Sequence, residues 1–423
     1  MVRIIFLIIL LSIAASIKPS QPLRIGIITD IHYLSEQLMD GESALDKYMQ
    51  SSGRMIKYTP YVLDSVLYHY NEGSKEDDAN IDILLVCGDI TKDGEKQNHL
   101  DFVEKLKPLQ KKGVHIFVVP GNHDINMPNA VGYKEDKTYK VDNVSPKEFE
   151  KIYSNCGYYQ AFKRDTASLS YAAVISKSSE SETWLLAIDA ARYNEYTTHS
   201  ISRGRILPQT EKWIVDLLVE AKEKNAQVIG MMHWGLVEHF PMQSTLMEEY
   251  LVDDWQRLAK LFADNGMIAI FTGHSHANDI TRFLSPTGTQ IYDIETGALT
   301  SYPFSYRVVN LYPSNMNVST FNIKSLPQNQ KLGEESKSLL YNLSKATVKN
   351  KLNNLPFELL IENKELFADI LAQVFLLHVG GDEVISEKLK EQIKILMNAD
   401  NFQEDGNFEL DFPPEDNNVT ITF

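Results

Sequence analysis

Cysteine is nearly absent from this chain of 423 residues, which holds only Cys87 and Cys156. Two cysteines cannot supply the disulfide framework of a domain this large, so a disulfide-stapled scaffold is excluded. Cys87 ends an apolar run directly before Gly88 and Asp89. This context predicts a buried strand residue rather than half of a disulfide.

Positive charge is also scarce, with 41 Lys and Arg against 57 Asp and Glu, a formal net charge of -16. A protein that follows a nucleic-acid backbone needs a basic stripe, and no dense Lys/Arg cluster occurs here. The charge therefore argues against nucleic acid as a partner. It suits a soluble extracytoplasmic protein and a site that needs carboxylates for cations. The sequence does not indicate an oligomeric state.

Long apolar runs are few, and one stands at the start of the chain. Arg3 is followed by the apolar run Ile4–Leu11 and by small residues up to Ser16, which is typical of a signal peptide over residues 1–16. The run is too short to span a bilayer comfortably, so we expect no membrane span after its removal. We therefore expect a secreted or extracytoplasmic protein, periplasmic or lumenal if so routed. N-glycosylation patterns, which matter only in a eukaryotic source, occur at Asn143, Asn317, Asn342 and Asn418.

The chain does contain enough apolar residues, 43%, to bury one large core. Apolar, β-branched runs recur, and continuous runs of this kind predict strands that are buried on both faces. Amphipathic stretches with helical spacing lie between them, at Lys96–Leu109, Gln209–Lys224 and Met247–Asp264. Alternating strands and helices predict an α/β fold whose sheet is covered on both sides. The expected strands are Leu23–Thr29, Ile83–Cys87, His115–Val119, Trp184–Ile188, Val228–Met232 and Met267–Thr272.

Two stretches look like insertions into this core. Ser35–Lys75 follows the first strand and contains an expected helix at Pro60–Tyr70, and Asn126–Ser168 follows the third strand. Loops this long in a compact domain are usually lids or binding surfaces, which is how we interpret both.

The pattern changes after Thr296, where two shorter strands are expected at Arg307–Leu311 and Asn317–Ile323. We place a domain boundary near Leu326, between a main domain of residues 23–326 and a mostly helical appendage of residues 327–423. The acidic tail from residue 400 onward is expected to be loosely ordered. The expected helices of the appendage are Phe357–Leu377 and Ser386–Met397, the second capped by Ser386.

Ionisable and amide side chains gather directly after five of the expected strands. In open α/β sheets ligands bind outside the carboxyl ends of the strands, so we expect these five corners to meet. Gly88, Gly121 and Gly273 would let the backbone turn sharply there. The side chains expected to meet are those of Asp30, His32, Asp89, Asn122, His123, Asp124, His233, His274 and His276.

These residue types favour a site for two metal ions. Imidazole nitrogens with a few carboxylate or amide oxygens suit Zn, Fe or Mn rather than Ca or a pure Mg cage. Two ions roughly 3.5–4 Å apart need a shared ligand, and a carboxylate has two oxygens for this purpose. Asp89 is the expected bridge. The sequence therefore predicts two divalent or transition metal ions.

The order D-x-H, G-D, G-N-H-D, H and G-H-x-H resembles that of the calcineurin-like metallophosphoesterase family over residues 23–312. The resemblance implies a four-layered α/β/β/α sandwich, with residues 23–326 as its catalytic domain. The strings Gly88–Thr91, Pro120–Asp124 and Gly273–His276 are most similar to the exported, cyclic-nucleotide phosphodiesterase-like branch. The resemblance implies one metal at Asp30, His32, Asp89 and His276, and the other at Asp89, Asn122, His233 and His274.

The resemblance also implies a hydrolase whose partner is a small phosphorylated substrate, a phosphodiester or a small phosphomonoester. A hydroxide shared by the two metals would attack phosphorus in line, while the metals neutralise the developing charge. His123, which is not a metal ligand in the family, would protonate the leaving group. Asp124 would orient the His123 ring or raise its pKa. The chain departs from the protein Ser/Thr phosphatase and purple acid phosphatase branches at Lys92 and Asp93, where those branches carry other residues.

Two alternatives stay open. A non-catalytic scaffold of this fold would be expected to have lost ligands or the acid, and none is missing here. An exported nuclease is disfavoured by the negative charge. Histidines and arginines outside the motifs are expected in the core, at the surface or in surface salt bridges, namely His69, His99, His115, His199, His239, His378, Arg192, Arg203 and Arg205.

Overall fold

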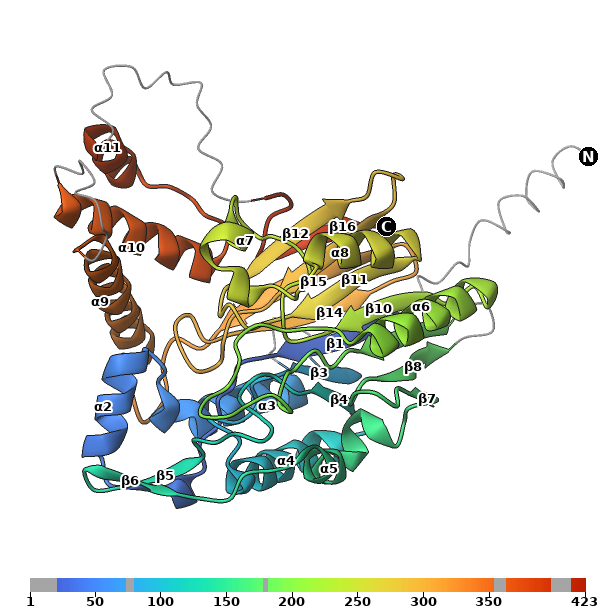
Figure 1. The fold of residues 1–423 in the computed structure, drawn as a ribbon, viewed down its shortest axis with the longest axis horizontal. Helices are drawn as coiled ribbons and strands as arrows, with labels where there is room; N and C mark the ends of the chain where they lie inside the picture. Colours follow the sequence, from blue (N-terminus) through green and yellow to red (C-terminus); the bar gives the residue numbers. More distant parts are fainter. Residues whose placement is uncertain (1–20, 74–79, 178–181, 354–362, 397–411) are drawn as a thin grey trace, which may run out of the picture.

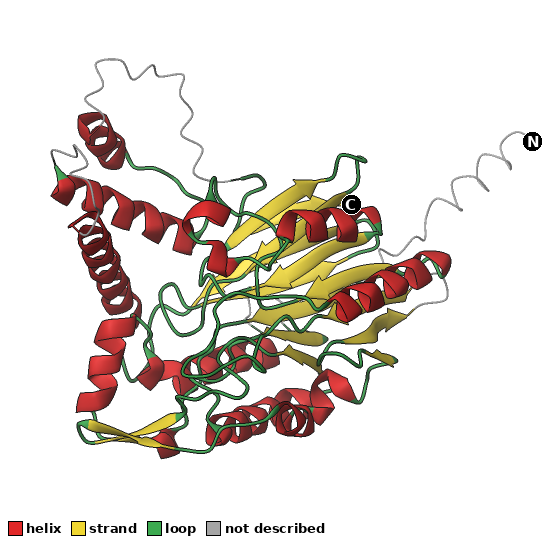
Figure 2. Cartoon of the chain, viewed as in Figure 1, coloured by secondary structure: helices red, strands yellow, loops and turns green. Residues whose placement is uncertain are grey.

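The computed structural model describes residues 21–73, 80–177, 182–353, 363–396 and 412–423. Two β-sheets pack face to face, and helices lie on the outer side of each sheet (Figures 1 and 2). The expected signal peptide, residues 1–16, lies outside the described residues. Within the described ranges, no helix combines the length and the apolar character needed to cross a membrane.

The first sheet has six strands in the order β16-β15-β14-β1-β3-β4. Strands β1, β3 and β4 run parallel to one another, whereas β14, β15 and β16 extend the sheet in antiparallel fashion. Parallel pairing places the carboxyl ends of β1, β3 and β4 at one edge. The strands span Leu23–Ile28 (β1), Ile83–Cys87 (β3), His115–Val119 (β4), Ser305–Leu311 (β14), Asn315–Asn322 (β15) and Asn418–Thr422 (β16).

The second sheet has seven strands in the order β12-β13-β11-β10-β9-β8-β7. Its four central strands β13, β11, β10 and β9 are parallel, and β12, β8 and β7 pair antiparallel at the margins. The carboxyl ends of β10 and β11 therefore also share an edge. The strands span Lys163–Arg164 (β7), Tyr171–Lys177 (β8), Glu182–Ala187 (β9), Gln227–Met231 (β10), Met267–Thr272 (β11), Asp279–Leu284 (β12) and Gln290–Glu295 (β13).

Apolar side chains fill the space between the two sheets. Ile27 of β1, Leu85 of β3, Ile229 of β10 and Phe271 of β11 all belong to this core and are buried. Continuous apolar runs are required because each strand faces the other sheet on one side and helices on the other.

Four helices form the outer layers. On the first sheet, α3 (Thr59–Glu72) and α4 (Lys96–Lys111) pack their apolar faces against the core. On the second sheet, α6 (Pro208–Glu223) and α8 (Trp255–Asp264) build a further apolar cluster with Trp184. The predicted four-layered α/β/β/α sandwich is confirmed.

Several elements agree with the sequence to the residue, and one helix does not. Strands β3, β4 and β11 have the expected bounds. The helix expected at Met247–Asp264 begins only at Trp255. Its first half forms a 3-10 turn, η4 (Glu248–Tyr250), and a bridge from Leu251 to Gly235, which lies beside the carboxyl end of β10.

The two insertions pack on each other. Residues of both form a small apolar cluster that includes Leu45, Met49 and Tyr133. A three-stranded sheet in the order β2-β5-β6 joins them. Their elements are η1 (Glu36–Leu38), β2 (Met39–Asp40), α2 (Ser43–Ser52), η2 (Ile56–Tyr58), β5 (Val131–Lys134), β6 (Lys137–Lys140), α5 (Pro146–Ile152) and the π-helical turn η3 (Ser154–Tyr158).

The C-terminal region is mostly helical, as expected, with α9 (Leu332–Asn353), α10 (Lys364–Gly380) and α11 (Glu387–Leu396). Ser386 Oγ accepts a hydrogen bond from Leu389 N at 3.2 Å, which confirms the predicted cap. Residues 357–362 of the helix expected from Phe357 lie outside the described residues.

The expectation of a loosely ordered tail is wrong for residues 418–422. They form β16, which pairs with β15 and places Val419 opposite Val318. Ile421 is buried, so the strand adds to the core as well as to the hydrogen-bonded ladder. Residues 400–411 lie outside the described residues, and the boundary near Leu326 stays a prediction.

Candidate metal centre

The loops that follow β1, β3, β4, β10 and β11 bring the expected ligands together. Six carboxylate and imidazole side chains fall into two groups of three, and the possible ligand atoms within each group lie within 4.8 Å of one another. The strands are parallel, so their carboxyl ends meet at a common edge of the sandwich. The first group is Asp30, His32 and His276, and the second is Asp89, His233 and His274.

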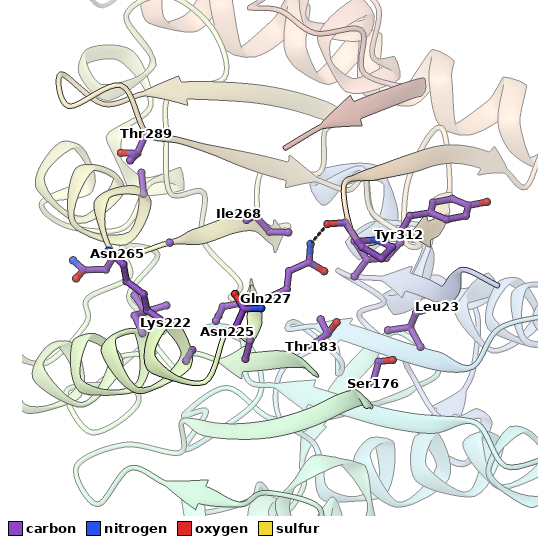
Figure 3. A pocket seen from close by; sticks show the side chains of 18 of the residues that line it. Leu23, Ser176, Thr183, Lys222, Asn225, Gln227, Asn265, Ile268, Thr289 and Tyr312 are labelled. Carbon is purple, nitrogen blue, oxygen red and sulfur yellow. Dashed lines mark hydrogen bonds between the residues drawn. The ribbon is translucent and has the colours of Figure 1, made fainter. Parts of the chain in front are cut away.

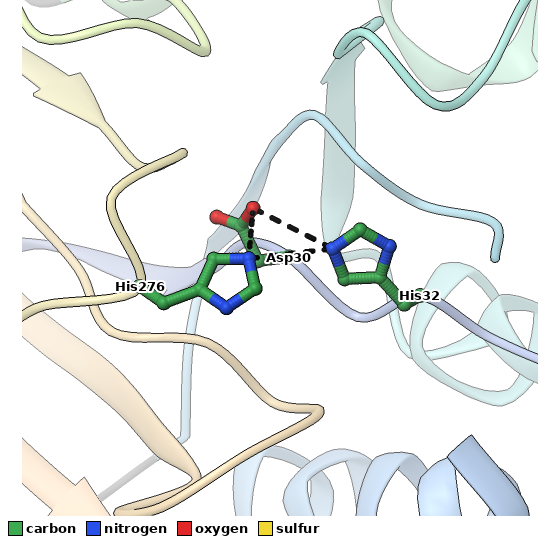
Figure 4. A group of neighbouring side chains, drawn as sticks. All are labelled: Asp30, His32 and His276. Atoms are coloured by element: carbon green, nitrogen blue, oxygen red, sulfur yellow. Dashed lines mark hydrogen bonds and ion pairs between the residues drawn. The ribbon is translucent and has the colours of Figure 1, made fainter. Parts of the chain in front are cut away.

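In the first group, two imidazole nitrogens and a carboxylate oxygen point toward one another (Figure 4). His276 Nε2 lies 3.2 Å from Asp30 Oδ1, and His32 Nε2 lies 3.9 Å from the same oxygen. The two imidazole nitrogens are 3.4 Å apart. Asp30 Oδ1 is buried and has no hydrogen-bond partner, so it is available to a cation.

In the second group, Asp89 stands between the two sets of ligands. Asp89 Oδ2 lies 3.4 Å from His233 Nε2 and 3.6 Å from His32 Nε2 of the first group. His274 Nδ1 lies 3.1 Å from His233 Nε2. One carboxylate oxygen therefore faces both groups at nearly equal distance.

Asn122 follows β4 and completes the expected set. Its Oδ1 atom is buried and has no hydrogen-bond partner among the described residues. Tyr196 donates a hydrogen bond from its hydroxyl to the Asn122 carbonyl at 3.1 Å, which fixes the backbone at this point. An amide oxygen buried without a donor is the donor type that a metal ion would use.

Further contacts hold the ligands in one orientation. Asp30 Oδ2 accepts hydrogen bonds from Thr29 Oγ1 at 2.7 Å and from His274 N at 2.9 Å. His233 Nδ1 donates to Cys87 O at 2.8 Å, which turns Nε2 toward the other ligands. His274 Nε2 faces Glu249 O at 3.1 Å, so Nδ1 is its free ligand atom.

The backbone is strained at most of these positions. A residue with a side chain rarely adopts positive φ, and strain of this kind costs about 1–3 kcal/mol per residue and gathers at functional sites. Five of the seven expected ligands have positive φ: Asp30 (48°), His32 (42°), Asp89 (47°), His274 (74°) and His276 (63°).

The glycines of the motifs are needed for two different reasons. Gly88 has a φ of 90°, so it turns the chain as expected. Gly121 and Gly273 do not have positive φ. A Cβ atom at Gly121 would instead collide with the Asp89 carboxylate, and one at Gly273 would collide with Thr29 Oγ1. At these two positions glycine is needed for the close approach of the backbone and not for a positive φ.

The buried charges depend on one another. Burial alone would raise the pKa of Asp89, but His233 and His123 lower it well below its usual value. Burial alone would lower the pKa of His233, but Asp89 and Asp30 raise it to about 9. Burial lowers the pKa of His274 to about 3, and the charge of His233 is the second contribution. The site therefore holds ionised carboxylates away from water and needs positive charge beside them.

His123 contacts Asp93 and not Asp124. His123 Nδ1 lies 2.7 Å from Asp93 Oδ1. Asp124 instead accepts hydrogen bonds from Thr91 N at 2.9 Å and from Gly121 N at 2.8 Å, so its carboxylate is used by the backbone. Burial raises the pKa of Asp124 to about 6, and the charge of Asp89 is the second contribution. The expectation that Asp124 orients the His123 ring is therefore wrong, because Asp93 makes this contact.

Arg54, between α2 and η2, was not among the expected site residues. Burial lowers the pKa of His32, and the charge of Arg54 lowers it further. Burial would lower the pKa of Arg54 itself, but Tyr48, Asp89 and Asp93 raise it. No motif marks this arginine, and only the fold of the first insertion brings it to the site.

The other arginines behave as expected of surface residues. Arg192 pairs with Glu195 at 2.7 Å, Arg203 pairs with Asp253 at 2.8 Å, and Arg205 also pairs with Glu195. The two cysteines are buried and free, which confirms the prediction for Cys87.

An apolar cavity of about 330 Å³ lies beside the second group. Ser275, which separates His274 from His276, lines it, and so does Tyr250, whose ring lies 5.2 Å from the His274 ring. Its other walls come from the loop after β10, from α10 and from the loop that follows α10, with Phe240, Met247, Leu371, Val374, Phe375, His378 and Glu383.

A larger cavity of about 680 Å³ lies elsewhere (Figure 3). Leu23 and Gln227, the first residues of β1 and β10, line it. Gln227 Nε2 donates to Pro313 O at 3.3 Å across its wall. The cavity is therefore at the amino ends of the strands, opposite the ligands, and is not the active site.

Comparisons with known proteins agree with this geometry. The chain is 24% identical over 156 residues to the 3',5'-cyclic adenosine monophosphate phosphodiesterase CpdA of Haemophilus influenzae, which is 37% of this chain and about half, 52%, of that protein. A dimetal phosphatase from Danio rerio has a similar fold, with a TM-score of 0.50 and 16% identity over 71% of this chain and 96% of that one. The model of the family described as "Calcineurin-like phosphoesterase" matches residues 23–278, which is more than half of the chain. The chain belongs to the calcineurin-like phosphoesterase family.

Proposed function

We propose that the chain hydrolyses phosphodiesters with two metal ions bound at the described centre. Asp89 Oδ2, which faces both ligand groups, is the observation that carries this proposal. One ion would be held by Asp30, His32, Asp89 and His276, and the other by Asp89, Asn122, His233 and His274. Imidazoles with carboxylate and amide oxygens suit Zn, Fe or Mn.

A metal pair bound there would supply an activated water near neutral pH and would clamp the phosphoryl oxygens. The remaining steps belong to side chains. His123 gives the proton on Nε2 to the leaving oxygen, and Asp93 keeps its Nδ1 hydrogen-bonded, so that the ring has one defined orientation. The guanidinium of Arg54 can hold a phosphate oxygen through two N–H donors.

The apolar cavity favours a diester over a simple monoester. A monoester has only one organic group, which departs as the alcohol. A diester has a second organic group, which stays on the phosphate and must be accommodated by the protein. A cavity of about 330 Å³ next to His274 can bury such a group. The relative from Haemophilus influenzae is named as a phosphodiesterase, which supports the same substrate class.

Hydrolysis of two chromogenic esters tests this proposal. Chelated protein should be inactive, and added Mn²⁺ should restore hydrolysis of bis(p-nitrophenyl) phosphate with a higher kcat/KM than that of p-nitrophenyl phosphate. Asp89→Asn should lose metal at both positions and stay inactive, whereas Asp136→Asn, on an exposed turn, should behave like the unchanged protein. If the metal-loaded chain hydrolysed neither ester, a binding scaffold would be favoured. Activity on DNA would favour a nuclease.

We also propose that the protein is exported, because residues 1–16 have the pattern of a signal peptide. Sequencing the amino terminus of protein recovered outside the producing cell tests this. A mature chain that still begins at Met1 would contradict it.

A further inference from the structure

A second cluster, of two acids and one imidazole, lies at the wall of the apolar cavity and takes no part in the proposed proton transfer or metal pair. It comprises Asp279 at the start of β12, His378 near the end of α10, and Glu383 in the loop that follows. The possible ligand atoms of these three side chains lie within 4.8 Å of one another. They come from segments about 100 residues apart in the chain, so only the fold brings them together.

Two carboxylate oxygens of this cluster have no hydrogen-bond donor. Asp279 Oδ1 accepts from His239 Nδ1 at 2.6 Å and from Thr281 Oγ1 at 3.0 Å, but Asp279 Oδ2 has no such partner. Glu383 Oε1 lies 2.9 Å from His378 Nδ1, and Glu383 Oε2 has none. The side chains are 0% and 1% exposed, so water does not replace the missing donors.

Each imidazole around the cluster faces more than one acid. His239 Nε2 lies 3.3 Å from both Asp293 Oδ2 and Glu295 Oε2, and its Nδ1 contacts Asp279, so one imidazole faces three acids. His378 Nδ1 alone lies between Asp279 Oδ2, at 3.6 Å, and Glu383. The two imidazoles therefore leave Asp279 Oδ2 and Glu383 Oε2 without a hydrogen-bond donor.

The loop that carries Glu383 is held in place before any cation binds. Asp382 N donates to Asp416 Oδ2 at 2.7 Å, and Asp416 N donates to Asp382 Oδ1 at 2.8 Å. Asp416 Oδ1 also accepts from Ile280 N of β12 at 2.8 Å. Three segments, namely β12, the loop after α10 and the approach to β16, therefore meet at a fixed geometry.

We propose that Asp279, His378 and Glu383 bind a third divalent cation, separate from the two of the catalytic centre. Asp279 Oδ2, His378 Nδ1 and Glu383 Oε2 are the ligand atoms, a mixture of imidazole and carboxylate that suits Zn²⁺ or Mn²⁺. The ion joins β12 to α10, whose Leu371, Val374 and Phe375 line the apolar cavity. It is a structural ion that fixes one wall of the substrate site.

Anomalous diffraction from crystals of the full chain, dialysed against Zn²⁺, tests the proposal. We expect an anomalous peak between Asp279, His378 and Glu383, in addition to those at the catalytic centre. Glu383→Gln should lose this peak and one equivalent of zinc per chain while it keeps the catalytic peaks. Glu387→Gln, whose side chain is 87% exposed, is the matched control and should keep all of them.

An unchanged chain without a peak at this position, or a Glu383→Gln chain that retains it, would overturn the proposal. If Glu383→Gln did not fold, the map of the unchanged chain would decide alone. The outcome is independent of the catalytic centre, because its peaks lie at other residues. Loss of those peaks would count against the proposed function and not against the third site.

Discussion

At the scale of single residues, the pair His123–Asp93 separates proton transfer from metal binding. His123 is 15% exposed and Asp93 13%, so the pair lies at the edge of the buried ligands and open to a substrate. Lys92 is almost fully buried and forms an ion pair with Asp93, which keeps the carboxylate in place. A carboxylate held in this way fixes the tautomer and orientation of its imidazole.

We predict that His123→Ala keeps both catalytic metals and lowers turnover of esters with poor leaving groups by roughly 10²–10⁴-fold. Release of p-nitrophenolate should change much less, because this leaving group needs no proton. Asp93→Asn should act in the same direction with a smaller loss. The double variant should be no worse than His123→Ala, since the two residues act as a unit. Equal losses on good and poor leaving groups would contradict the role in proton transfer.

The metal ligands could be predicted from the sequence, whereas Asp93 could not. Each ligand stands within a few residues of a strand end, so parallel pairing alone brings them together. Asp93 lies in an irregular loop before α4, and its position depends on Gly94 (φ 71°) and on the bond from its own N to Glu95 Oε2 at 2.8 Å. Asp124, next to His123 in sequence, was the natural choice, but the backbone amides of Thr91 and Gly121 use its carboxylate.

At the scale of secondary-structure elements, the centre depends on how closely the ends of β3 and β4 approach. Gly121 follows β4 and Asp89 follows β3, and the two residues lie in contact. Because glycine has no side chain, the Asp89 carboxylate fits against it. His123 N then donates to Asp89 Oδ1 at 2.8 Å, so one oxygen is fixed by the backbone and the other faces the ligands.

We predict that Gly121→Ala displaces Asp89 and lowers the metal content at both catalytic positions, with a loss of about 10²-fold in kcat/KM. Gly380→Ala is the control, because a Cβ at that position meets only Tyr302 Oη at 3.9 Å. Metal analysis and hydrolysis of bis(p-nitrophenyl) phosphate measure the effect. Unchanged metal content in Gly121→Ala would show that the bridge does not depend on this close approach.

Elements of the sandwich were predicted well because their apolar runs are continuous, whereas long-range pairing near the carboxyl terminus was not. Residues 418–422 alternate polar and apolar side chains, and β16 places Val419 and Ile421 toward the core. The surrounding acids and prolines favoured a loose tail in the sequence. Pairing with β15, which no local pattern signals, decides the structure here.

At the scale of the whole molecule, cations and stability are coupled. Asp30, Asp89 and His233 are buried at the junction of both sheets, and metal-free protein must keep these charges away from water. A ligand that binds only the folded chain stabilises it by about 2.7 kcal/mol when its free concentration is 100 times Kd. Two such sites would add, because the unfolded chain cannot present these ligands together.

We therefore predict that chelation lowers Tm by several degrees, given roughly 2–4 °C per kcal/mol for domains of 150–250 residues. Asp89→Asn should show a much smaller shift between chelated and metal-loaded samples, since it cannot hold the pair. Melting curves at one fixed scan rate measure both, because a chain of this size can unfold irreversibly. Equal Tm values with and without chelator in the unchanged protein would mean that the two ligand groups bind no cation in the folded state. The ionised acids of the centre would then have to be balanced by His233 and its neighbours alone.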